Sequence, residues 1–206
     1  MTATTSKQRM RGTYSSPRQE ERQRRILETA RREITAVGYD ALTMAQLAKA
    51  SEVSTKTLYN LYGSKDELLL GAVAELMGNL EHRPEVEDAV PGVPTLLAFT
   101  KIIFRQIEET PAYAEVMARA MFKAESEHRL VDLLLGNPVR FAQAQLKLAV
   151  EAGQLSTGID IDGMSRILTG HHWGVVLMWS KGMIATSEIC ERALQSTQMS
   201  LSSLAK

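Results

Sequence analysis

The chain has 206 residues, 44% of them hydrophobic, which suits one or two modest domains with a real core. Its formal net charge is zero, which by itself argues against a nucleic-acid partner. The charge is unevenly distributed, however, because residues 1–67 hold twelve Lys and Arg against eight Asp and Glu, whereas residues 68–206 hold twelve against sixteen. A basic N-terminal third is what attraction to phosphates requires.

Cysteine usage and hydropathy predict a cytoplasmic protein. The single cysteine, Cys190, excludes an internal disulfide and lies in a helical apolar pattern that is typical of a buried thiol. Residues 1–19 hold no apolar segment suited to a signal peptide. The longest apolar run, Trp173 to Trp179, is too short to span a bilayer. We therefore expect no membrane partner.

Two predicted segments open the chain. Residues 1–16 are polar and carry Lys7, Arg9 and Arg11 without periodicity, which predicts a disordered basic arm. Such an arm is either a solvated tail or a segment that reaches a DNA minor groove. A first helix is predicted from residue 17 to 37, where Gly38 ends it.

Residues 43–62 predict a helix-turn-helix. Thr43 and Gln46 form a capping box for a short helix, and Ser54 caps a second helix that reaches about Asn60. Glu52 occupies the turn position that commonly needs a left-handed backbone and usually holds glycine. Two helices joined by so short a turn make the unit that places its second helix in a DNA major groove.

The rest of the chain divides at an acidic segment. Ser64 and Glu67 predict a second capping box and a long helix to about residue 80, which completes a DNA-binding domain over residues 17–80. Residues 81–94 hold three prolines and read as a linker. Residues 95–206 then predict an effector-binding and dimerisation domain.

Periodicity divides residues 95–206 into five or six helices. A break is expected at Gly136-Asn137-Pro138, and Asp162 is expected to cap the helix over residues 162–181. The last helix is predicted over residues 187–204. No strand pattern is evident, so the predicted fold is all-α, with about nine or ten helices.

The chain resembles the tetracycline-repressor (TetR) family of bacterial transcriptional regulators over about residues 20–80. Glu52, Lys56 and Tyr62 depart from the residues frequent in that family. The most specific stretch is TLYNLYGSKDELL, and the matching residues are Ile26, Ala30, Gly38, Tyr39, Thr43, Leu47, Ala48, Val53, Ser54, Thr57, Leu58, Tyr59, Tyr62, Ser64, Lys65 and Leu68. The resemblance implies a ligand-responsive repressor whose homodimer grips a palindromic double-stranded DNA operator and releases it when a small, largely apolar effector pushes the fourth helix.

Candidate DNA-binding residues surround the second helix of the motif. Side chains expected to reach base edges are Thr55, Lys56 and Asn60. Those expected to anchor phosphates are Thr43, Ser54, Thr57, Tyr59 and Lys65. Lys65 opposes the dipole of the helix that it begins, which suggests a role other than helix stability.

The C-terminal domain provides candidates for two further sites. A stripe on the last two helices can seat them within the chain or across a two-fold axis, and the resemblance favours the dimer. Its residues are Gly170, Gly174, Cys190, Leu194, Thr197, Leu201 and Leu204. Ligand-pocket candidates, each of which is more typical of plain core, are Phe99, Ile103, Met117, Met121, Phe122, Leu146, His172, Trp173 and Trp179.

The motifs of catalysis and metal binding are missing from the sequence. His171 and His172 have no His, Asp, Glu or Cys three or four residues away, and no phosphate-binding glycine loop or nucleophile elbow is present. We therefore expect no catalytic residue, no metal and no cofactor. Two alternatives remain: a helical module that binds a protein or ligand without DNA, and an all-helical small-molecule enzyme.

Overall fold

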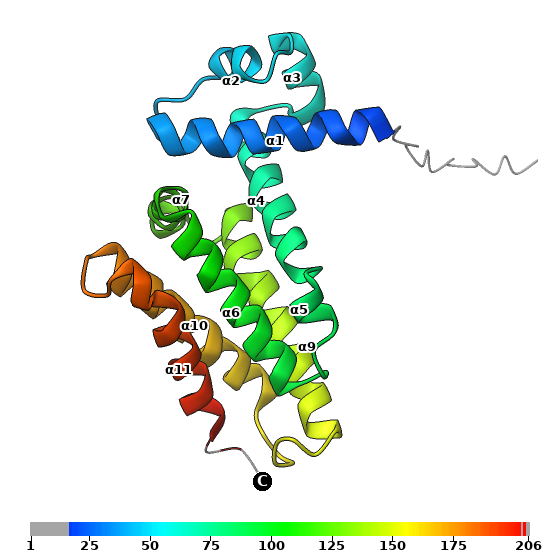
Figure 1. Cartoon of the computed structure of the whole chain (residues 1–206), viewed down its shortest axis with the longest axis vertical. Coiled ribbons are helices and arrows are strands. Elements are labelled where there is room, and N and C mark those ends of the chain that lie inside the picture. The colour runs from blue at the N-terminus through cyan, green and yellow to red at the C-terminus, as the bar shows by residue number, and fades with distance from the viewer. Residues whose placement is uncertain (1–16, 203, 205–206) are drawn as a thin grey trace, which may run out of the picture.

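The computed structural model describes residues 17–202 and 204, where all regular structure is helical (Figure 1). The predicted all-α fold is therefore confirmed. The head consists of α1 (Pro17–Val37), α2 (Met44–Ala50) and α3 (Thr55–Tyr62). The predicted arm at 1–16 lies outside the described residues. The remaining elements are α4 (Lys65–Glu81), α5 (Pro84–Glu87), α6 (Val93–Glu109), α7 (Pro111–Lys123), α8 (Arg129–Val131), a π-helix (Asp132–Gly136), α9 (Asn137–Glu151), α10 (Ile161–Ser180), a 3-10 turn (Thr186–Glu188) and α11 (Ile189–Ser202).

Helix α1 forms the floor of the head. It crosses the top of the body, and α2 and α3 lie above it (Figure 1). Ile26, Ala30 and Ile34, spaced four residues apart, are at most 1% exposed and pack with Leu58 of α3. The exposed sides of α2 and α3 therefore face away from the body.

Helix α4 connects the head to the body and belongs to both. Its first turns pack on α1 and α3, and its later turns pack on α6. The core that holds Leu58 also includes Tyr113 and Met117 of α7 and Leu130 of α8. One apolar core thus continues from the head into the body, whereas the division into domains at residues 81–94 remains a prediction.

Helix α6 occupies the centre of the body, as its mostly apolar sequence predicts. It packs against α4, α5, α7, α9 and α11, and Phe99, Ile102 and Phe104 are at most 7% exposed. Helix α10 packs against α9, α11 and α7. Within the described part of the chain, no helix has the length and hydropathy needed to cross a membrane.

The predicted break at Gly136-Asn137-Pro138 is wrong, because the chain stays helical there. Residues 132–136 form a π-helix that leads directly into α9. Pro138 has no N–H to offer the carbonyl of Leu134 four residues earlier. The indole Nε1 of Trp173 donates to that carbonyl at 3.1 Å, so a side chain from α10 replaces the missing backbone donor.

The cap of α10 also differs from the prediction. Asp160, and not Asp162, accepts the hydrogen bond from the backbone N–H of Gly163, at 2.9 Å. Asp162 lies in the first turn and binds Arg166 and Gln143, and the hydrogen bond from Arg166 lowers the pKa of the Asp162 carboxyl. The prediction failed because both aspartates are good caps and only the backbone decides between them.

Candidate DNA interface and ligand cavity

The motif of the head is built as the sequence predicts. The Thr43 hydroxyl accepts a hydrogen bond from the N–H of Gln46, whose side chain accepts from the N–H of Thr43, completing the capping box. The Ser54 hydroxyl accepts from the N–H of Thr57 at 3.0 Å. These bonds satisfy backbone donors at both helix starts. They fix where α2 and α3 begin.

Glu52 has the left-handed backbone expected of the turn. Its φ is 55°, and it is the only non-glycine residue with positive φ in residues 17–202 and 204. The turn closes with a hydrogen bond from the Val53 N–H to the Ala48 carbonyl at 3.0 Å. Ala48 is 2% exposed, so a larger side chain would separate the helices at their crossing. The geometry of the motif therefore persists although glycine is absent.

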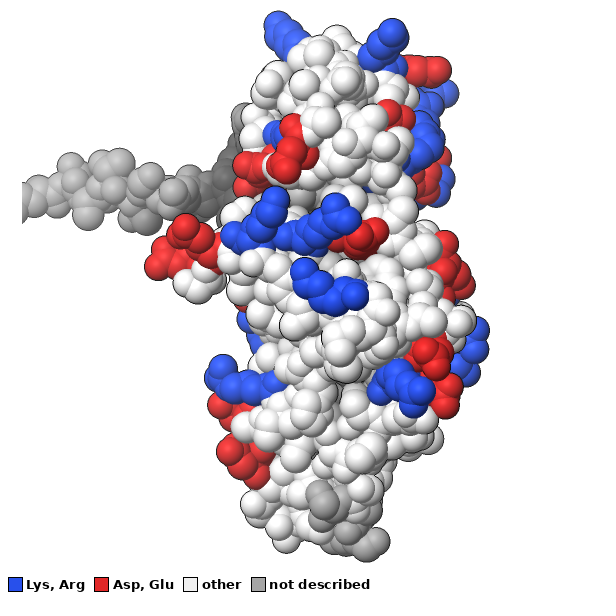
Figure 2. Space-filling model, turned by 90° about the vertical axis from the view of Figure 1, so that its left-hand side faces the viewer, with Lys and Arg blue, Asp and Glu red and all other residues white. Residues whose placement is uncertain are grey.

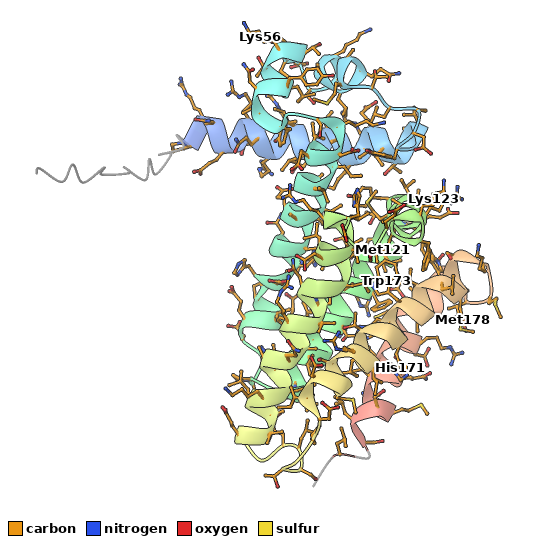
Figure 3. The ribbon with its side chains drawn as sticks, turned by 180° about the vertical axis from the view of Figure 1, so that it is seen from behind. Lys56, Met121, Lys123, His171, Trp173 and Met178 are labelled. Carbon is orange, nitrogen blue, oxygen red and sulfur yellow. The ribbon has the colours of Figure 1, made fainter. Side chains whose placement is uncertain are left out.

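Helix α3 presents polar side chains to solvent. Lys56 projects from the top of the head, on the side opposite the body (Figure 3). Thr55, Lys56 and Asn60 are exposed, and Tyr59 is 49% exposed, whereas Leu58 is fully buried. The predicted base-reading residues thus share one accessible face of one helix.

Lys65 does not have the free ammonium group that a purely DNA-facing role implies. Its Nζ donates to the carbonyls of Tyr39 and Leu42 at 2.9 and 3.0 Å and lies 4.2 Å from the centre of the Tyr39 ring. The group therefore ties α4 to the loop before α2. One N–H of the three remains for a phosphate, so the main contacts of Lys65 are structural.

The second predicted capping box is only half formed. Ser64 accepts from the N–H of Glu67 at 3.1 Å, but the Glu67 carboxylate pairs with Arg129 of α8. Figure 2 shows Lys and Arg side chains at the very top of the head, with Asp and Glu side chains just below and beside them and charges of both signs lower on the molecule. The head thus offers its positive groups where α2 and α3 are exposed.

A polar cluster joins the head to the body. Arg31 of α1 pairs with Glu75 of α4 at 2.5 Å and also donates to the Ala72 carbonyl at 2.9 Å. The hydroxyls of Tyr62 and Tyr113 are buried without a hydrogen-bond partner. Burial, with a smaller contribution from the Glu75 charge, raises the pKa of Tyr62 to about 12, and burial also raises the pKa of Tyr113. No local pattern in the sequence predicts this cluster, because its members are 31 or more residues apart except for Tyr62 and Glu75.

The body contains an apolar cavity of about 150 Å³. Its walls come from α4, α6, α7, the π-helix, the start of α9 and α10. No Lys, Arg, Asp or Glu lines it. The lining residues are Val73, Leu76, Met77, Leu80, Ile103, Phe104, Gln106, Ile107, Thr110, Tyr113, Ala114, Met117, Ala118, Leu134, Pro138, Thr169, His172, Trp173 and Val176.

Four of the nine predicted pocket residues line this cavity: Ile103, Met117, His172 and Trp173. The other five lie elsewhere. Phe99 packs against the tilted ring of Phe141, and Met121 is buried. Phe122 is 48% exposed and makes an edge-to-face contact with Trp173. Leu146 is buried beside α10, and the indole N–H of Trp179 donates to the Thr186 hydroxyl. The prediction missed the wall from α4, although Val73, Leu76, Met77 and Leu80 make an apolar row at helical spacing.

A larger open cleft of about 760 Å³ lies between the head and the body. Tyr39 and Asp40 lie on its upper side, and Arg119, Lys123 and His128 lie on its lower side. Figure 2 shows mixed charges in this region. Met121 and Lys123, from the last turn of α7, are labelled in Figure 3. Among the described residues, no group of three His, Cys, Asp or Glu is placed to hold a metal ion.

Most members of the predicted dimer stripe on α11 face their own chain. Cys190, Thr197 and Leu201 are at most 7% exposed, and α11 packs against α6 and α10. Burial raises the pKa of the Cys190 thiol. Leu194 and Leu204 pack at the edges of the same apolar clusters.

Gly170 and Gly174 of α10 do lie on an open surface. A Cβ built at either position meets no atom within 4 Å. The same helix exposes Ile167, Leu177 and Met178 by 47%, 42% and 43%. Figure 3 shows Met178 and His171 on α10, at the edge of the body opposite α4. Because these residues recur every three or four positions, they form one exposed row, which we call the α10 row.

Residues 26–72, which contain the capped motif and its supporting core, match the model of bacterial regulatory proteins of the tetR family. The fold and the exposed second helix define a helix-turn-helix protein with a helical body. Over residues 26–72 the chain is similar to the TetR family of bacterial regulators.

Curated relatives match part of the chain. It is 29% identical over 112 residues to the HTH-type transcriptional repressor KstR of Rhodococcus jostii, which covers 54% of this chain and 53% of that protein. KstR of Mycolicibacterium smegmatis is 27% identical over 113 residues, again with 54% of this chain and 55% of the relative covered. The chain thus matches about half the length of these relatives.

Solved structures match nearly the whole fold. A TetR-family regulator from Rhodococcus sp. superposes with a TM-score of 0.72 at 18% identity, covering 88% of this chain and 99% of that one. FadR of Bacillus subtilis, solved with stearoyl-CoA, gives a TM-score of 0.72 at 18% identity, with 88% and 98% covered. At this identity the likeness extends to the fold alone.

Proposed function

We propose that this protein is a ligand-responsive DNA-binding repressor. The observation that carries the proposal is the exposed face of α3, held by the Ser54 cap and the Glu52 turn within the stretch that matches the tetR family. Thr55, Lys56 and Asn60 read base edges in the major groove. The similarity to KstR, which is described as a transcriptional repressor, supports repression over activation.

Phosphate anchoring is assigned to the side chains that border this face. Thr43, Ser54, Thr57 and Tyr59 carry hydroxyl groups at or near the accessible surface of α2 and α3. Ser54 and Thr57 already share a hydrogen bond of 2.8 Å, so their hydroxyls are oriented before DNA arrives. Lys65 contributes the one N–H that its carbonyl partners leave.

The protein acts as a homodimer through the α10 row. The glycines let a second copy of α10 approach closely, and Ile167, Leu177 and Met178 supply apolar area that is otherwise exposed. Two heads related by a two-fold axis then reach the two halves of a palindromic operator. This face replaces the α11 stripe as the proposed interface.

The effector is a small, largely apolar molecule that enters the cavity of the body. The cavity wall includes Val73 and Met77 of α4 and Tyr113 and Met117 of α7. Both helices also pack against α1, so a change in their separation moves the head. A ligand that binds more tightly when the two heads are too far apart for the operator lowers the fraction of dimers that can bind DNA. A ligand with equal affinity for both arrangements leaves that fraction unchanged.

A mobility-shift titration against the DNA flanking the gene tests DNA binding. We expect binding that weakens steeply as salt rises, because phosphate contacts release counterions. Asn60→Ala is expected to change the order of preference among operator variants, whereas Tyr59→Phe, which removes only a hydroxyl, weakens binding to all of them alike. Binding that ignores salt, or equal effects of both substitutions on every DNA, contradicts these roles.

The dimer is tested by Gly174→Arg. The open space at this position lets the monomer fold, but the added side chain blocks close approach of a second α10. We expect light scattering to report monomers and operator affinity to fall at least tenfold. Gly78→Arg is the matched control, because it adds the same charge to α4 at a position that is also open. Dimers that survive Gly174→Arg place the interface elsewhere.

A further inference from the structure

The polar atoms of the cavity in the body are few, and their hydrogen bonds can be followed individually. His172 lies between α6 and α11, with its ring edge-on to Phe104 and its Nε2 2.8 Å from the Thr197 hydroxyl oxygen. The Thr197 hydroxyl donates its only proton to the carbonyl of Ala193 at 3.0 Å. With that proton on the Ala193 carbonyl, the Thr197 oxygen accepts from His172, and this arrangement assigns the imidazole proton to Nε2.

The imidazole thus presents an acceptor on its other side. Nδ1 of His172 has a lone pair and no partner among residues 17–202 and 204, while the residue lines the cavity. Burial lowers the pKa of His172 to about 4, which keeps the ring neutral at physiological pH. His172 can accept a hydrogen bond from a ligand at Nδ1, but its only N–H is already donated to Thr197.

Two other side-chain donors of the cavity wall are already used. The Thr169 hydroxyl donates to the Ser165 carbonyl at 3.0 Å, and the Trp173 N–H donates to the Leu134 carbonyl at 3.1 Å. The Tyr113 hydroxyl has no hydrogen-bond partner, but its oxygen has almost no accessible surface, so a molecule in the cavity does not contact it.

Two further polar residues lie near the mouth, at the end of α6. The Thr110 hydroxyl donates to the Gln106 carbonyl at 2.7 Å, and Nε2 of Gln106 donates to the Thr110 hydroxyl oxygen at 3.2 Å. Only the second N–H of Gln106 remains. The interior of the cavity therefore offers acceptors, chiefly His172 Nδ1 and the oxygen of Thr169, and no side-chain donor.

From this accounting we infer that the effector is an uncharged, hydroxyl-bearing apolar molecule whose O–H donates to Nδ1 of His172. The inference rests on the proposed function, because the bound molecule is an effector only if the protein is a ligand-responsive repressor. A carboxylate brings only acceptors and a charge to a site that has no cation in its walls, so it is excluded from the interior. A cavity of roughly 150 Å³ is large enough for a benzene-sized ring.

The test uses three small probes with the full-length protein. These are 4-ethylphenol, which donates and accepts; 4-ethylanisole, which only accepts; and 4-ethylbenzoate, which is charged. Binding is followed by titration calorimetry and by fluorescence of Trp173, which lines the cavity. We expect 4-ethylphenol to bind about tenfold more tightly than 4-ethylanisole, the effect of one satisfied hydrogen bond. No saturable binding is expected for 4-ethylbenzoate.

Variants assign the preference to His172. His172→Phe keeps a ring against Phe104 but removes the acceptor, so the two neutral probes are expected to bind within about twofold of each other. Thr197→Val frees the imidazole proton and is expected to reduce the preference without removing it, which gives a second measurement if His172→Phe folds poorly. His82→Phe is the control, because His82 is exposed and does not line the cavity.

The outcomes separate this inference from the proposed function. Equal affinity for the two neutral probes, tight binding of 4-ethylbenzoate, or an unchanged preference in both variants overturns the inference, even if operator DNA is bound. Loss of salt-dependent DNA binding overturns the proposed function, even if the preference for 4-ethylphenol is found. Release of operator DNA by 4-ethylphenol, and not by 4-ethylanisole at equal concentration, supports both.

Discussion

The head and the body of this protein are stabilised by different means. In the head, α2 and α3 have only seven and eight residues, and each begins with a side-chain cap, from Thr43 and Ser54. In the body, α6, α7 and α9 have 13 to 17 residues, begin with proline in the first turn and have no side-chain cap. Short helices are marginal alone, so the head depends on a few local hydrogen bonds. The body depends on packing, which leaves it free to enclose a cavity.

The head and the body nevertheless share core residues. The core of the head includes Tyr113 and Met117 from α7, which also line the cavity of the body. Arg31 and Glu75 add an ion pair across the same junction. The difference in construction therefore allows independent tuning of the surface and the cavity, while the shared core couples their stability.

The first prediction tests that coupling with Leu58→Ala. Leu58 is fully buried in the head, so truncation is expected to lower the free energy of unfolding by about 2–5 kcal/mol. Both tryptophans, Trp173 and Trp179, lie in the body, so their fluorescence reports on that region. If the core is continuous, the fluorescence transition shifts together with the circular dichroism transition.

Leu146→Ala provides the matched comparison, since Leu146 is equally buried but lies in a cluster of the body alone. It is expected to have a similar effect on both signals. A Leu58→Ala protein whose circular dichroism splits into two transitions, with the fluorescence transition unmoved, would show that head and body unfold independently.

The second prediction concerns pH and the body. His172 has a pKa of about 4 in the folded protein, lowered mainly by burial, against 6.5 for an ordinary histidine. The unfolded chain therefore binds more protons between these values, and stability falls as pH decreases from 6.5 towards 4. Over this range the His172 imidazole lowers the free energy of unfolding by about 3 kcal/mol, at about 1.4 kcal/mol per unit of pH.

Denaturant titrations of the wild type and His172→Phe from pH 7 to pH 4 measure this effect. Carboxylates titrate in both proteins, so the difference between the two curves isolates the imidazole. We expect the variant to lose less stability over this range. Parallel curves would mean that His172 remains hydrated enough to be protonated in the folded state.

The same contrast explains what the sequence could predict. The Ser54 cap, the strained turn at Glu52 and the buried Leu58 depend on residues within a few positions of one another, and all three are as predicted. Local spacing determines such features. The α4 wall of the cavity was also available as a periodic row, but the prediction did not use it.

Features that depend on distant partners were missed. The carbonyls that bind Lys65 lie 23 and 26 residues away, and the indole that completes the π-helix lies 39 residues from its acceptor. The stripe of Cys190 and Thr197 is apolar whether it packs on its own chain or on a second copy, so the sequence could not tell these arrangements apart. The structure packs this stripe on its own chain, and a role of α11 in a dimer remains a prediction.

The third prediction weakens the junction between head and body. Glu75→Gln removes the carboxylate from Arg31 while preserving size, and both side chains are about four-fifths buried. The expected loss of stability is about 2 kcal/mol, typical of a hydrogen bond to a charged group. The measurement is denaturant unfolding at pH 7.

Glu28→Gln is its control, because Glu28 pairs with Arg24 on the surface with both side chains about half exposed. That substitution is expected to change stability by less than about 0.5 kcal/mol. Equal effects of the two substitutions would mean that solvent screens the Arg31 pair as fully as the surface pair, and the ion pair would then add little to the junction.

The smallest predicted effect is a gain, and it belongs to the head alone. Glu52 adopts a φ of 55°, which strains every residue with a Cβ but not glycine. Glu52→Gly is expected to raise the free energy of unfolding by about 1 kcal/mol, and Glu52→Ala, which removes the same carboxylate but keeps the Cβ, is expected to leave it nearly unchanged. Both substitutions remove a negative charge beside the proposed DNA surface, so both should raise operator affinity at low salt. The difference between the two variants therefore measures backbone strain, and their common effect measures charge; equal stabilities would show that the turn relaxes around Glu52 without strain.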